Sequence, residues 1–249
     1  MDLKGAVAIV TGCTGGLGQR ICRAFAMQGT QVAGIYQKSR DQAEALAAEW
    51  SALGPRCVAF QADVTEPAEI QRMVEEVLAE FRRIDILVNN AAYNQWVPFK
   101  DLDGMTLELW EHILRANTTS PFLCIKAVAP LMQRQNQGRI VNVASIAGLA
   151  PSGSSIAYAV SKAALVHLTR CLAVALGPEI AVNAVAPGTM MGTRMTAKLA
   201  PDFVDKNIKG SALQKPVERD DVAEQILLFC KSDSTTGQVS VIDSGRVYH

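Results

Sequence analysis

Short runs of β-branched and other apolar residues alternate along the chain with longer segments of helical periodicity. Several short runs are almost entirely apolar, which is typical of parallel strands covered on both faces. The predicted strands are Val7–Val10, Gln31–Tyr36, Cys57–Gln61, Ile84–Asn89, Arg139–Ala144, Ile180–Ala186 and Val239–Ile242. The predicted helices are Leu17–Gln28, Arg40–Ser51, Pro67–Phe81, Leu107–Met132, Ile156–Leu176 and Asp220–Phe229. This alternation predicts a single α/β domain over residues 1–249, with a doubly wound, seven-stranded parallel sheet and helices on both faces.

Two long stretches lack a regular pattern and are expected to be loops. Residues 91–104 follow the fourth predicted strand, and residues 188–215 follow the sixth. Ligands in open α/β sheets bind outside the carboxyl ends of strands, so both stretches are candidate substrate loops. They contain Tyr93, Trp96, Pro98, Phe99, Met190, Met191 and Met195. Together these side chains suit an apolar, adaptable pocket, although each by itself is better explained by packing onto the core.

The composition supports a large core and excludes several classes of protein. Of 249 residues, 49 % are hydrophobic and 19 % are charged, which excludes a disordered chain. The 24 Lys and Arg balance the 24 Asp and Glu, so binding to nucleic acid or an anionic membrane is not expected. The six Cys and three His show neither disulfide nor zinc-site spacing. With no apolar run suited to a signal peptide or a membrane span, we expect a soluble cytoplasmic protein without a bound metal.

A glycine-rich turn follows the first predicted strand directly. Residues 11–18 are Thr-Gly-Cys-Thr-Gly-Gly-Leu-Gly, and a helix is predicted from Leu17 onwards. Gly12 suits a tight turn, Gly16 a close approach of a ligand to the backbone, and Gly18 the packing of helix on strand. A pyrophosphate would lie over the free N–H groups at the helix start, where the helix dipole favours it. A structural turn in an unrelated α/β protein is the alternative, and the position directly after the first strand weakens it.

The end of the second predicted strand bears on the choice between the two nicotinamide nucleotides. A carboxylate here would bond the ribose 2′-hydroxyl of NAD, whereas a cation accommodates the 2′-phosphate of NADP. Tyr36 is followed by Gln37, Lys38, Ser39 and Arg40, and the first acid is Asp41. Lys38 and Arg40 therefore favour NADP(H). The alternative is that both are ordinary solvated charges at a helix start, which leaves NAD(H) open.

Tyr158 and Lys162 lie four positions apart in the helix predicted over Ile156–Leu176, so they share a face. A free tyrosine has a pKa of about 10, too high for a base at neutral pH. A neighbouring ammonium favours the phenolate, which makes Tyr158 a candidate acid/base toward a carbonyl or an alcohol. Many helices contain such a pair without function, so it needs support from elsewhere in the chain.

That support comes from polar residues at the ends of several other predicted strands. They are Asp63 with Val64, Asn89 with Asn90 and Ala91, Ser145, and Pro187-Gly188 followed by Thr189 and Thr193. Asn117 is also polar, inside an otherwise apolar stretch of the predicted helix Leu107–Met132. Each residue alone suits a cap or a turn, but together at one sheet edge they indicate a site.

The chain resembles the short-chain dehydrogenase/reductase family over nearly its whole length, from Lys4 to Asp243, with several motifs in the family order. The motif Thr11-Gly12-x-x-x-Gly16-x-Gly18 is similar to the family's cofactor loop, Asn89-Asn90-Ala91 to its strand motif, and Asn117, Ser145, Tyr158 and Lys162 to its catalytic tetrad. The resemblance implies a single-domain Rossmann fold. It also implies hydride transfer between a nicotinamide and a ketone or secondary alcohol.

The same resemblance implies roles for individual residues. Tyr158 is the acid/base, Ser145 bonds the substrate oxygen, and Lys162 binds the nicotinamide ribose and lowers the pKa of Tyr158. Asn117 holds a water in the proton relay. The implied cofactor-binding residues are Gly12, Thr14, Gly16, Leu17, Gly18, Lys38, Ser39, Asp63, Val64, Asn90, Ala91, Tyr158, Lys162, Pro187 and Gly188; the candidate substrate contacts are Ser145, Ile146, Tyr158, Trp96 and Met190. Ala92 and Ser244 stand where the family commonly has glycine, and neither change removes a reacting group.

Within the family, the chain is most similar to the 3-oxoacyl-carrier-protein reductases, so a β-ketoacyl thioester is one candidate substrate of an NADP(H)-dependent carbonyl reductase. The resemblance also implies a homotetramer with an interface formed by the helices 107–132 and 156–176. The alternatives are an NAD(H)-dependent secondary alcohol dehydrogenase, a lyase or epimerase on the same scaffold, and a regulator without catalysis. The presence of Ser145, Tyr158 and Lys162 argues against the regulator.

Overall fold

The computed structural model describes residues 1–248, in which seven strands form one sheet in the order β3-β2-β1-β4-β5-β6-β7. The strands are β1 (Val7–Thr11), β2 (Gln31–Tyr36), β3 (Cys57–Gln61), β4 (Ile86–Asn89), β5 (Gly138–Val143), β6 (Ile180–Pro187) and β7 (Val239–Ile242). Every neighbouring pair is parallel, which confirms the predicted sheet. The strand order reverses between β1 and β4, and sheets of this kind bind ligands outside the carboxyl ends at that point.

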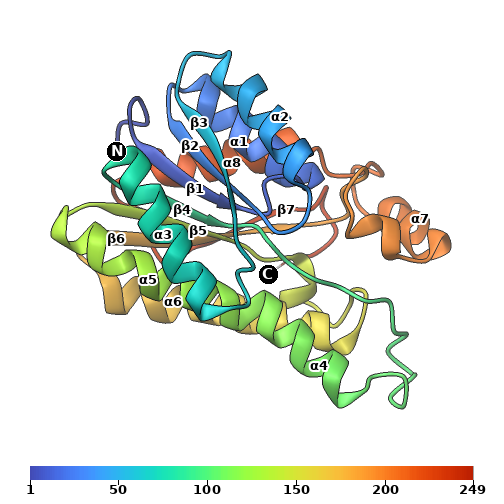
Figure 1. Ribbon diagram of the computed structural model, residues 1–249. Helices are drawn as coiled ribbons and strands as arrows, with labels where there is room; N and C mark the ends of the chain where they lie inside the picture. Colours follow the sequence, from blue (N-terminus) through green and yellow to red (C-terminus); the bar gives the residue numbers. More distant parts are fainter. Residues whose placement is uncertain (249) are drawn as a thin grey trace.

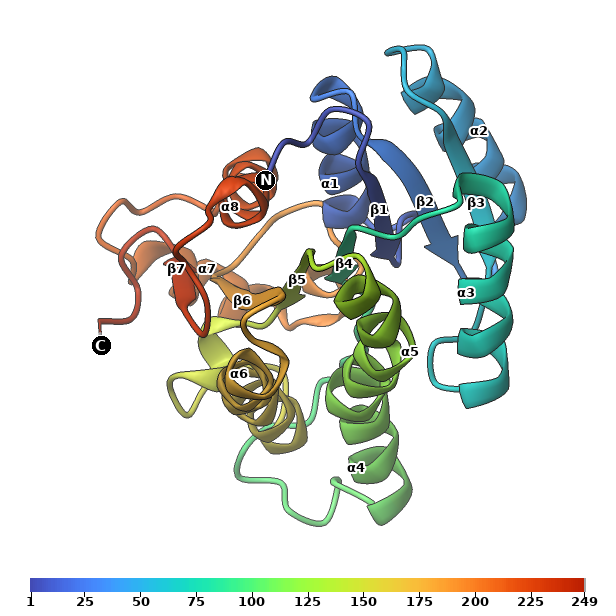
Figure 2. The ribbon, with the colours of Figure 1, turned by 90° about the vertical axis from the view of Figure 1, so that its left-hand side faces the viewer.

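Helices cover both faces of the sheet, as predicted (Figures 1 and 2). On one face lie α1 (Gly16–Met27), α2 (Arg40–Ser51) and α8 (Arg219–Lys231), and on the other lie α3 (Pro67–Phe81), α5 (Ser120–Arg134) and α6 (Ile156–Leu176). The helix α4 (Leu107–Leu114) precedes α5, and the loop after β6 contains α7 (Pro201–Lys209). Two short 3-10 turns complete the fold, η2 (Ile146–Gly148) after β5 and η3 (Thr196–Lys198) after β6.

Each strand sends alternate side chains into two separate cores. In β1, Ala8 and Val10 belong to the core beneath α1, α2 and α8, whereas Val7 and Ile9 belong to the core beneath α3, α5 and α6. All five residues of β1 are buried. Because both faces of the sheet are covered, a central strand needs apolar residues at every position. Continuous apolar runs were therefore a good guide to the strands.

The long helix predicted over residues 107–132 is interrupted. Residues 115–119 form a π-helical segment, η1 (Arg115–Thr119), between α4 and α5. Pro121 has no N–H group to offer the preceding turn, and the Ser120 hydroxyl donates to the carbonyl of Arg115 at 2.9 Å. Single π turns inside helices are frequent at functional sites, and this one contains Asn117.

The helix α7 lies in the stretch 188–215, which the sequence indicated as loop. It begins at Pro201, a residue suited to the first helical position, and Lys209 pairs with Asp205 at 2.7 Å. Its apolar residues Phe203, Val204 and Ile208 lie on one side of the helix, but nine residues are too few for that period to stand out from a loop.

Among the described residues, α6 is the one helix with the length and apolar composition to span a membrane. Its contacts instead fix it against the sheet. The buried Lys162 donates to the carbonyl of Val143 in β5 at 2.8 Å, and the Thr169 hydroxyl accepts from Asn142 in β5 at 3.0 Å. These polar contacts are those of a helix that covers a sheet.

Candidate active site

The turn between β1 and α1 has the backbone geometry that binds a phosphate group. Gly12 has a φ of +67°, a left-handed conformation that favours glycine. A Cβ atom on Gly18 would collide with the Gly12 carbonyl oxygen, so glycine at this position lets α1 approach the turn. Gly15 caps α1 without any side-chain hydrogen bond. The N–H groups at the start of α1 are therefore available to an anion.

The side chains of Thr11 and Asn90 join the carboxyl ends of β1 and β4. The Thr11 hydroxyl accepts hydrogen bonds from the N–H groups of Asn90 at 3.0 Å and of Ala91 at 2.9 Å. The side-chain amide of Asn90 donates to the carbonyl of Thr11 at 2.8 Å and to that of Gly12 at 3.2 Å. These bonds hold the glycine turn beside the residues that follow β4.

A second set of buried polar contacts joins β4, β5 and α6. The Asn89 amide donates to the side-chain oxygen of Asn142 at 2.9 Å, and the Asn142 amide donates to the Thr169 hydroxyl at 3.0 Å. All three side chains are almost fully buried, so each needs its partner. The chain of contacts fixes the position of α6, which carries Tyr158 and Lys162.

Two serine caps position the reacting groups. Ser145 lies two residues after β5 and caps η2, where its hydroxyl accepts from the N–H of Ala147 at 3.2 Å. Ser155 caps α6, and its hydroxyl accepts from the N–H of Tyr158 at 3.2 Å. Serine is a favoured residue at a helix start because its short side chain satisfies an otherwise free N–H. Tyr158 is thus held in the first turn of α6.

Burial controls the acidity of Tyr158 and Lys162. Burial raises the pKa of Tyr158 to about 12, and hydrogen bonding with Ser145 offsets this only in part. Burial lowers the pKa of Lys162 to about 7. The Lys162 nitrogen lies 5.8 Å from the centre of the Tyr158 ring. The charge of the ammonium alone predicts a lower pKa for Tyr158, but dehydration disfavours the charged form of each group and dominates.

Asn117 connects the loop after β4 to α6. It is fully buried, and its Oδ1 accepts from the N–H of Tyr93 at 2.8 Å. Its amide donates to the carbonyl of Tyr93 at 2.9 Å and to the hydroxyl of Ser161 at 3.0 Å. The Ser161 hydroxyl in turn donates to the carbonyl of Tyr158 at 2.8 Å. Through these bonds Asn117 supports the helical turn that carries Tyr158.

A cleft of about 360 Å³ at the carboxyl ends of the strands brings most of the predicted site residues together. Its lining includes Gly12, Thr14, Gly16, Leu17, Gly18, Lys38, Ser39, Asn90, Ala91, Ser145, Ile146, Tyr158, Lys162, Pro187, Gly188 and Met190. A volume of this size is within the range of small-molecule sites. The cleft runs from the glycine turn and the end of β2 to the residues around Tyr158.

Four predicted residues lie outside this lining: Asn117, Trp96, Asp63 and Val64. Trp96 contacts Phe203 of α7 edge to face, with ring centres 5.0 Å apart. Asp63 accepts a hydrogen bond at 2.6 Å from Gln37, which does line the cleft. Val64 packs against the core beneath α3.

The lining contains three cationic side chains, those of Lys38, Lys162 and Arg194, and no carboxylate. Arg40 lies outside it, since its Nε atom is 3.3 Å from the Tyr36 hydroxyl and 3.6 Å from the carboxylate of Glu44. The sequence favoured Arg40 as the partner of Lys38 at the cofactor phosphate. In the structure Arg194, from the loop after β6, lines the cleft and Arg40 does not. Among residues 1–248, no group of three or more His, Cys, Asp or Glu side chains is placed to hold a metal.

Several lining residues had no signal in the sequence: Asn94, Arg194, Thr196, Leu199, Phe203 and Asn207. All but Asn94 come from the segment between β6 and α8, where loop and short helix show no usable periodicity. Pro201 was the one available sign that a helix begins there.

The residues of the cleft fit a nicotinamide dinucleotide. The uncapped start of α1 and the glycine turn would hold its pyrophosphate, and Lys38 and Ser39 lie where its adenosine ribose would be bound. Ser145, Tyr158 and Lys162 lie at the other end, where the nicotinamide and a substrate oxygen would be bound.

Comparison with known proteins also indicates an enzyme that uses a nicotinamide dinucleotide. Residues 6–203 match the family model for short chain dehydrogenases. The chain is 35 % identical to a 3-oxoacyl-acyl-carrier-protein reductase of Synechocystis, over 98 % of each chain. It is also 35 % identical to a subunit of a hydroxy(phenyl)methylsuccinyl-CoA dehydrogenase of Thauera aromatica, over 99 % of this chain and 98 % of the relative.

Among solved structures, the NADPH-dependent 3-quinuclidinone reductase of Rhodotorula rubra superposes with a TM-score of 0.91 at 28 % identity. The match covers 98 % of this chain and 92 % of that one. Fold, motifs and relatives agree. This chain belongs to the short-chain dehydrogenase/reductase family and is an oxidoreductase that interconverts carbonyl compounds and alcohols with a nicotinamide nucleotide.

Proposed function

We propose that this enzyme is an NADPH-dependent reductase of 3-oxoacyl thioesters, with Tyr158 as the proton donor. The observation that carries the proposal is the meeting of Ser145, Tyr158 and Lys162 with a glycine turn in one cleft whose lining has no carboxylate. The reaction converts a ketone, NADPH and a proton into a secondary alcohol and NADP⁺.

Ser145 and Tyr158 act on the carbonyl oxygen of the substrate. Both hydroxyl groups line the same cleft. With its pKa raised to about 12, Tyr158 keeps its proton at neutral pH, which suits a general acid in the direction of reduction. Ser145 donates a hydrogen bond to the same oxygen and orients the ketone. When bound, the nicotinamide supplies the hydride.

Lys162 and Asn117 support Tyr158 in different ways. The Lys162 amine donates to the carbonyl of Val143 and lies one helical turn from Tyr158, and its proposed role is to bond a ribose hydroxyl of the cofactor. Asn117 is a positioning residue, because it holds the Tyr158 turn through Ser161 and does not line the cleft. A water retained beside Asn117 would connect this network to solvent.

The preference for NADPH is supported by the end of β2. Lys38 and Ser39 line the cleft there, and no acidic side chain competes for the ribose 2′-hydroxyl. The similar fungal reductase is named as NADPH-dependent. Fluorescence titration of the two reduced nucleotides tests this preference. We expect a lower Kd for NADPH, and equal affinities or tighter NADH binding would contradict it.

The acyl thioester is supported by the relatives and by the substrate end of the cleft. Two relatives at equal identity are named for thioester substrates, one on a carrier protein and one on coenzyme A. Met190, Met195, Leu199 and Phe203 give this end an apolar, adaptable wall. Acetoacetyl-CoA and acetoacetyl carrier protein should be reduced with a higher kcat/KM than a simple ketone such as cyclohexanone. Equal values would show that the thioester is not recognised.

A second candidate is the reverse reaction, oxidation of a hydroxyacyl thioester, because one of those relatives is named a dehydrogenase. Absorbance at 340 nm in both directions, with 3-oxoacyl-CoA and 3-hydroxyacyl-CoA, separates the two. A lyase or epimerase would leave the amount of reduced nucleotide unchanged.

We place the enzyme in the cytoplasm as a homotetramer, in line with the expectation from the sequence.

A further inference from the structure

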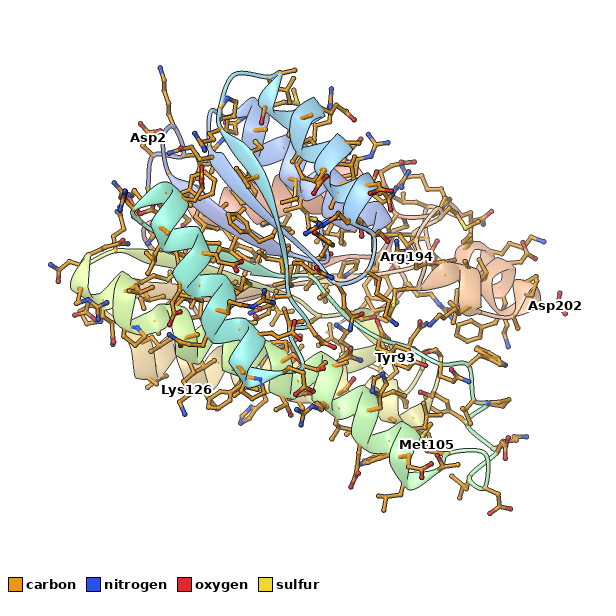
Figure 3. All side chains as sticks on the ribbon, viewed as in Figure 1. Asp2, Tyr93, Met105, Lys126, Arg194 and Asp202 are labelled. Atoms are coloured by element: carbon orange, nitrogen blue, oxygen red, sulfur yellow. The ribbon has the colours of Figure 1, made fainter. Side chains whose placement is uncertain are left out.

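Arg194 is a charged side chain of the cleft that the proposed reaction does not use. It lies in the loop between β6 and α7, and its Nη2 atom is 3.5 Å from the Ser39 hydroxyl at the end of β2. These residues are 155 positions apart in the chain. Figure 3 shows Arg194 between α2 and α7, at the end of the sheet where the cleft opens. The guanidinium therefore lies beside the residues that follow β2.

The cations at this end of the cleft have no counter-charge. Neither Lys38 nor Arg194 takes part in an ion pair within residues 1–248, and no Asp or Glu lines the cleft. Arg40 differs, since its guanidinium lies beside Glu44 and the Tyr36 hydroxyl. Two unpaired cations that line the same end of the cleft, one of them beside a serine hydroxyl, suit a dianionic phosphate.

We propose that Arg194, which lies beside Ser39, binds the 2′-phosphate of NADP(H) together with Lys38 and so makes the loop after β6 part of the cofactor-specificity site. This inference rests on the proposed use of NADPH. It assigns to the substrate loop a role in distinguishing the two nucleotides, in addition to its role around the substrate.

The structure of the loop connects this role to the substrate end. Thr193 and Met195, the neighbours of Arg194, both line the cleft. The Thr193 hydroxyl accepts from the N–H of Thr196 at 3.1 Å, and the carbonyl of Met195 accepts from the Asn94 amide at 3.1 Å. An arginine bound to a phosphate would restrain the same short segment that borders the substrate. Bound NADPH should therefore order this loop more than bound NADH does.

The test compares Arg194→Gln with Arg40→Gln, two neutral variants of arginines near the same turn. We expect Arg194→Gln to raise the Kd for NADPH about tenfold or more, because a charged hydrogen bond is lost, and to leave the Kd for NADH nearly unchanged. Arg40→Gln should change neither constant appreciably. The fragments 2′,5′-ADP and 5′-AMP, measured by calorimetry, separate the phosphate contact from catalysis. Arg194→Gln should weaken only 2′,5′-ADP, and Arg194→Lys should recover part of the loss.

Three outcomes would overturn the inference. The first is an unchanged Kd for NADPH in Arg194→Gln. The second is an equal increase in the Kd for NADPH and NADH, which would assign Arg194 to the pyrophosphate that both nucleotides share. The third is a larger increase in the Kd for NADPH in Arg40→Gln than in Arg194→Gln. If Arg194→Gln unfolds, the ratio of the two fragment affinities in Arg194→Lys decides. If the wild-type enzyme prefers NADPH and Arg194→Gln keeps that preference, only the inference about Arg194 fails. If the wild-type enzyme does not prefer NADPH, the proposed cofactor fails as well.

Protection of the loop provides a second measurement. Amide hydrogen exchange of peptides covering residues 190–197 should be slower with 2′,5′-ADP than with 5′-AMP in the wild-type enzyme, and the difference should vanish in Arg194→Gln. The same difference in both proteins would contradict a contact through Arg194.

Discussion

At the scale of single residues, the pKa of Tyr158 determines whether its phenol can donate or accept a proton at neutral pH. A phenol whose pKa is raised to about 12 by burial is protonated throughout the physiological range. It can give a proton to an alkoxide that forms during reduction, and it cannot serve as a base without help. A nearby positive charge would have to lower that pKa for the oxidation of an alcohol. The raised pKa of Tyr158 is therefore consistent with the proposed role of this phenol as the proton donor in reduction.

Tyr158→Phe removes the proton donor and keeps the ring. We expect kcat for reduction of acetoacetyl-CoA to fall by about 10²–10⁴, the usual contribution of a positioned acid. The Kd for NADPH should change by no more than about twofold, because Tyr158 is only one of many implied cofactor contacts and the phosphate contacts are unchanged. Stopped-flow absorbance and fluorescence titration measure the two quantities. Retained kcat in Tyr158→Phe would refute the assignment of Tyr158.

Lys162 makes the stability of the protein depend on pH. Burial lowers its pKa from 10.5 to about 7, so between these values the unfolded chain binds more protons than the folded one. The free energy of unfolding therefore rises with pH in this window, by at most ~1.4 kcal/mol per pH unit. Tyr158 has the opposite effect, confined to the interval from pH 10 to about 12, because its pKa is raised.

Lys162→Met should reduce the rise of the free energy of unfolding with pH. Urea unfolding at pH 7 and pH 8 should give a higher free energy of unfolding at the higher pH for the wild-type protein and a smaller difference for the variant. Both values lie below the range in which the buried cysteines, whose pKa values are raised from 9.0, would lower the stability. Lys126→Met removes an exposed amine from α5 and should keep the slope of the wild-type protein (Figure 3). A variant with an unchanged slope would mean that Lys162 is charged in the folded protein throughout this range.

At the scale of elements, the glycine turn combines two demands. It must leave N–H groups free for an anion, and it must let α1 approach β1. Gly18 serves the second demand, because its missing Cβ leaves room for the carbonyl of Gly12. Gly15 has an ordinary φ of −73°, and a Cβ there would lie 3.3 Å from the same oxygen.

Alanine at these two glycines should therefore differ in effect. We expect Gly18→Ala to cost about 1–3 kcal/mol of stability, because a backbone oxygen must move. Gly15→Ala should cost about 0.5 kcal/mol or less. Thermal unfolding followed by circular dichroism compares them. Similar losses in both variants would show that the turn tolerates a side chain at Gly18.

The elements also show how far the sequence could predict this site. Strand and helix periodicity predicted which elements carry Ser145, Tyr158 and Lys162, and the structure has all three in the cleft lining. Each is anchored to a regular element with a strong apolar pattern. The π-helical segment around Asn117 had no such signal, because a proline and side-chain hydrogen bonds decide it locally. Arg194 could not be found either. Its position depends on how an irregular loop folds over a distant strand end, and neither propensity nor spacing encodes that.

At the scale of the whole molecule, apolar side chains are exposed on helices of both faces of the sheet. Figure 2 shows α8 on one side of the sheet and α5 and α6 on the other. On α5 and α6 the exposed apolar side chains are Phe122, Val160 and Val174, the last with 86 % of its area exposed. On α8 it is Leu228, beside the edge strand β7, whose four residues are only half-buried. Exposed apolar helices and an open strand edge are features of interfaces. If each surface binds its own copy, the two would give the homotetramer proposed above two kinds of twofold contact.

The assembly should therefore come apart in steps. Light scattering of the wild-type protein should give a mass about four times the 26.7 kDa of one chain. Val174→Glu should leave dimers joined through α8 and β7, Leu228→Glu should leave dimers joined through α5 and α6, and the double variant should be monomeric. Leu53→Glu, at an exposed leucine in the turn after α2, controls for the added charge and should stay tetrameric. A monomeric wild-type protein, or a tetramer that survives Val174→Glu, would show that α6 is exposed to solvent in the functional enzyme.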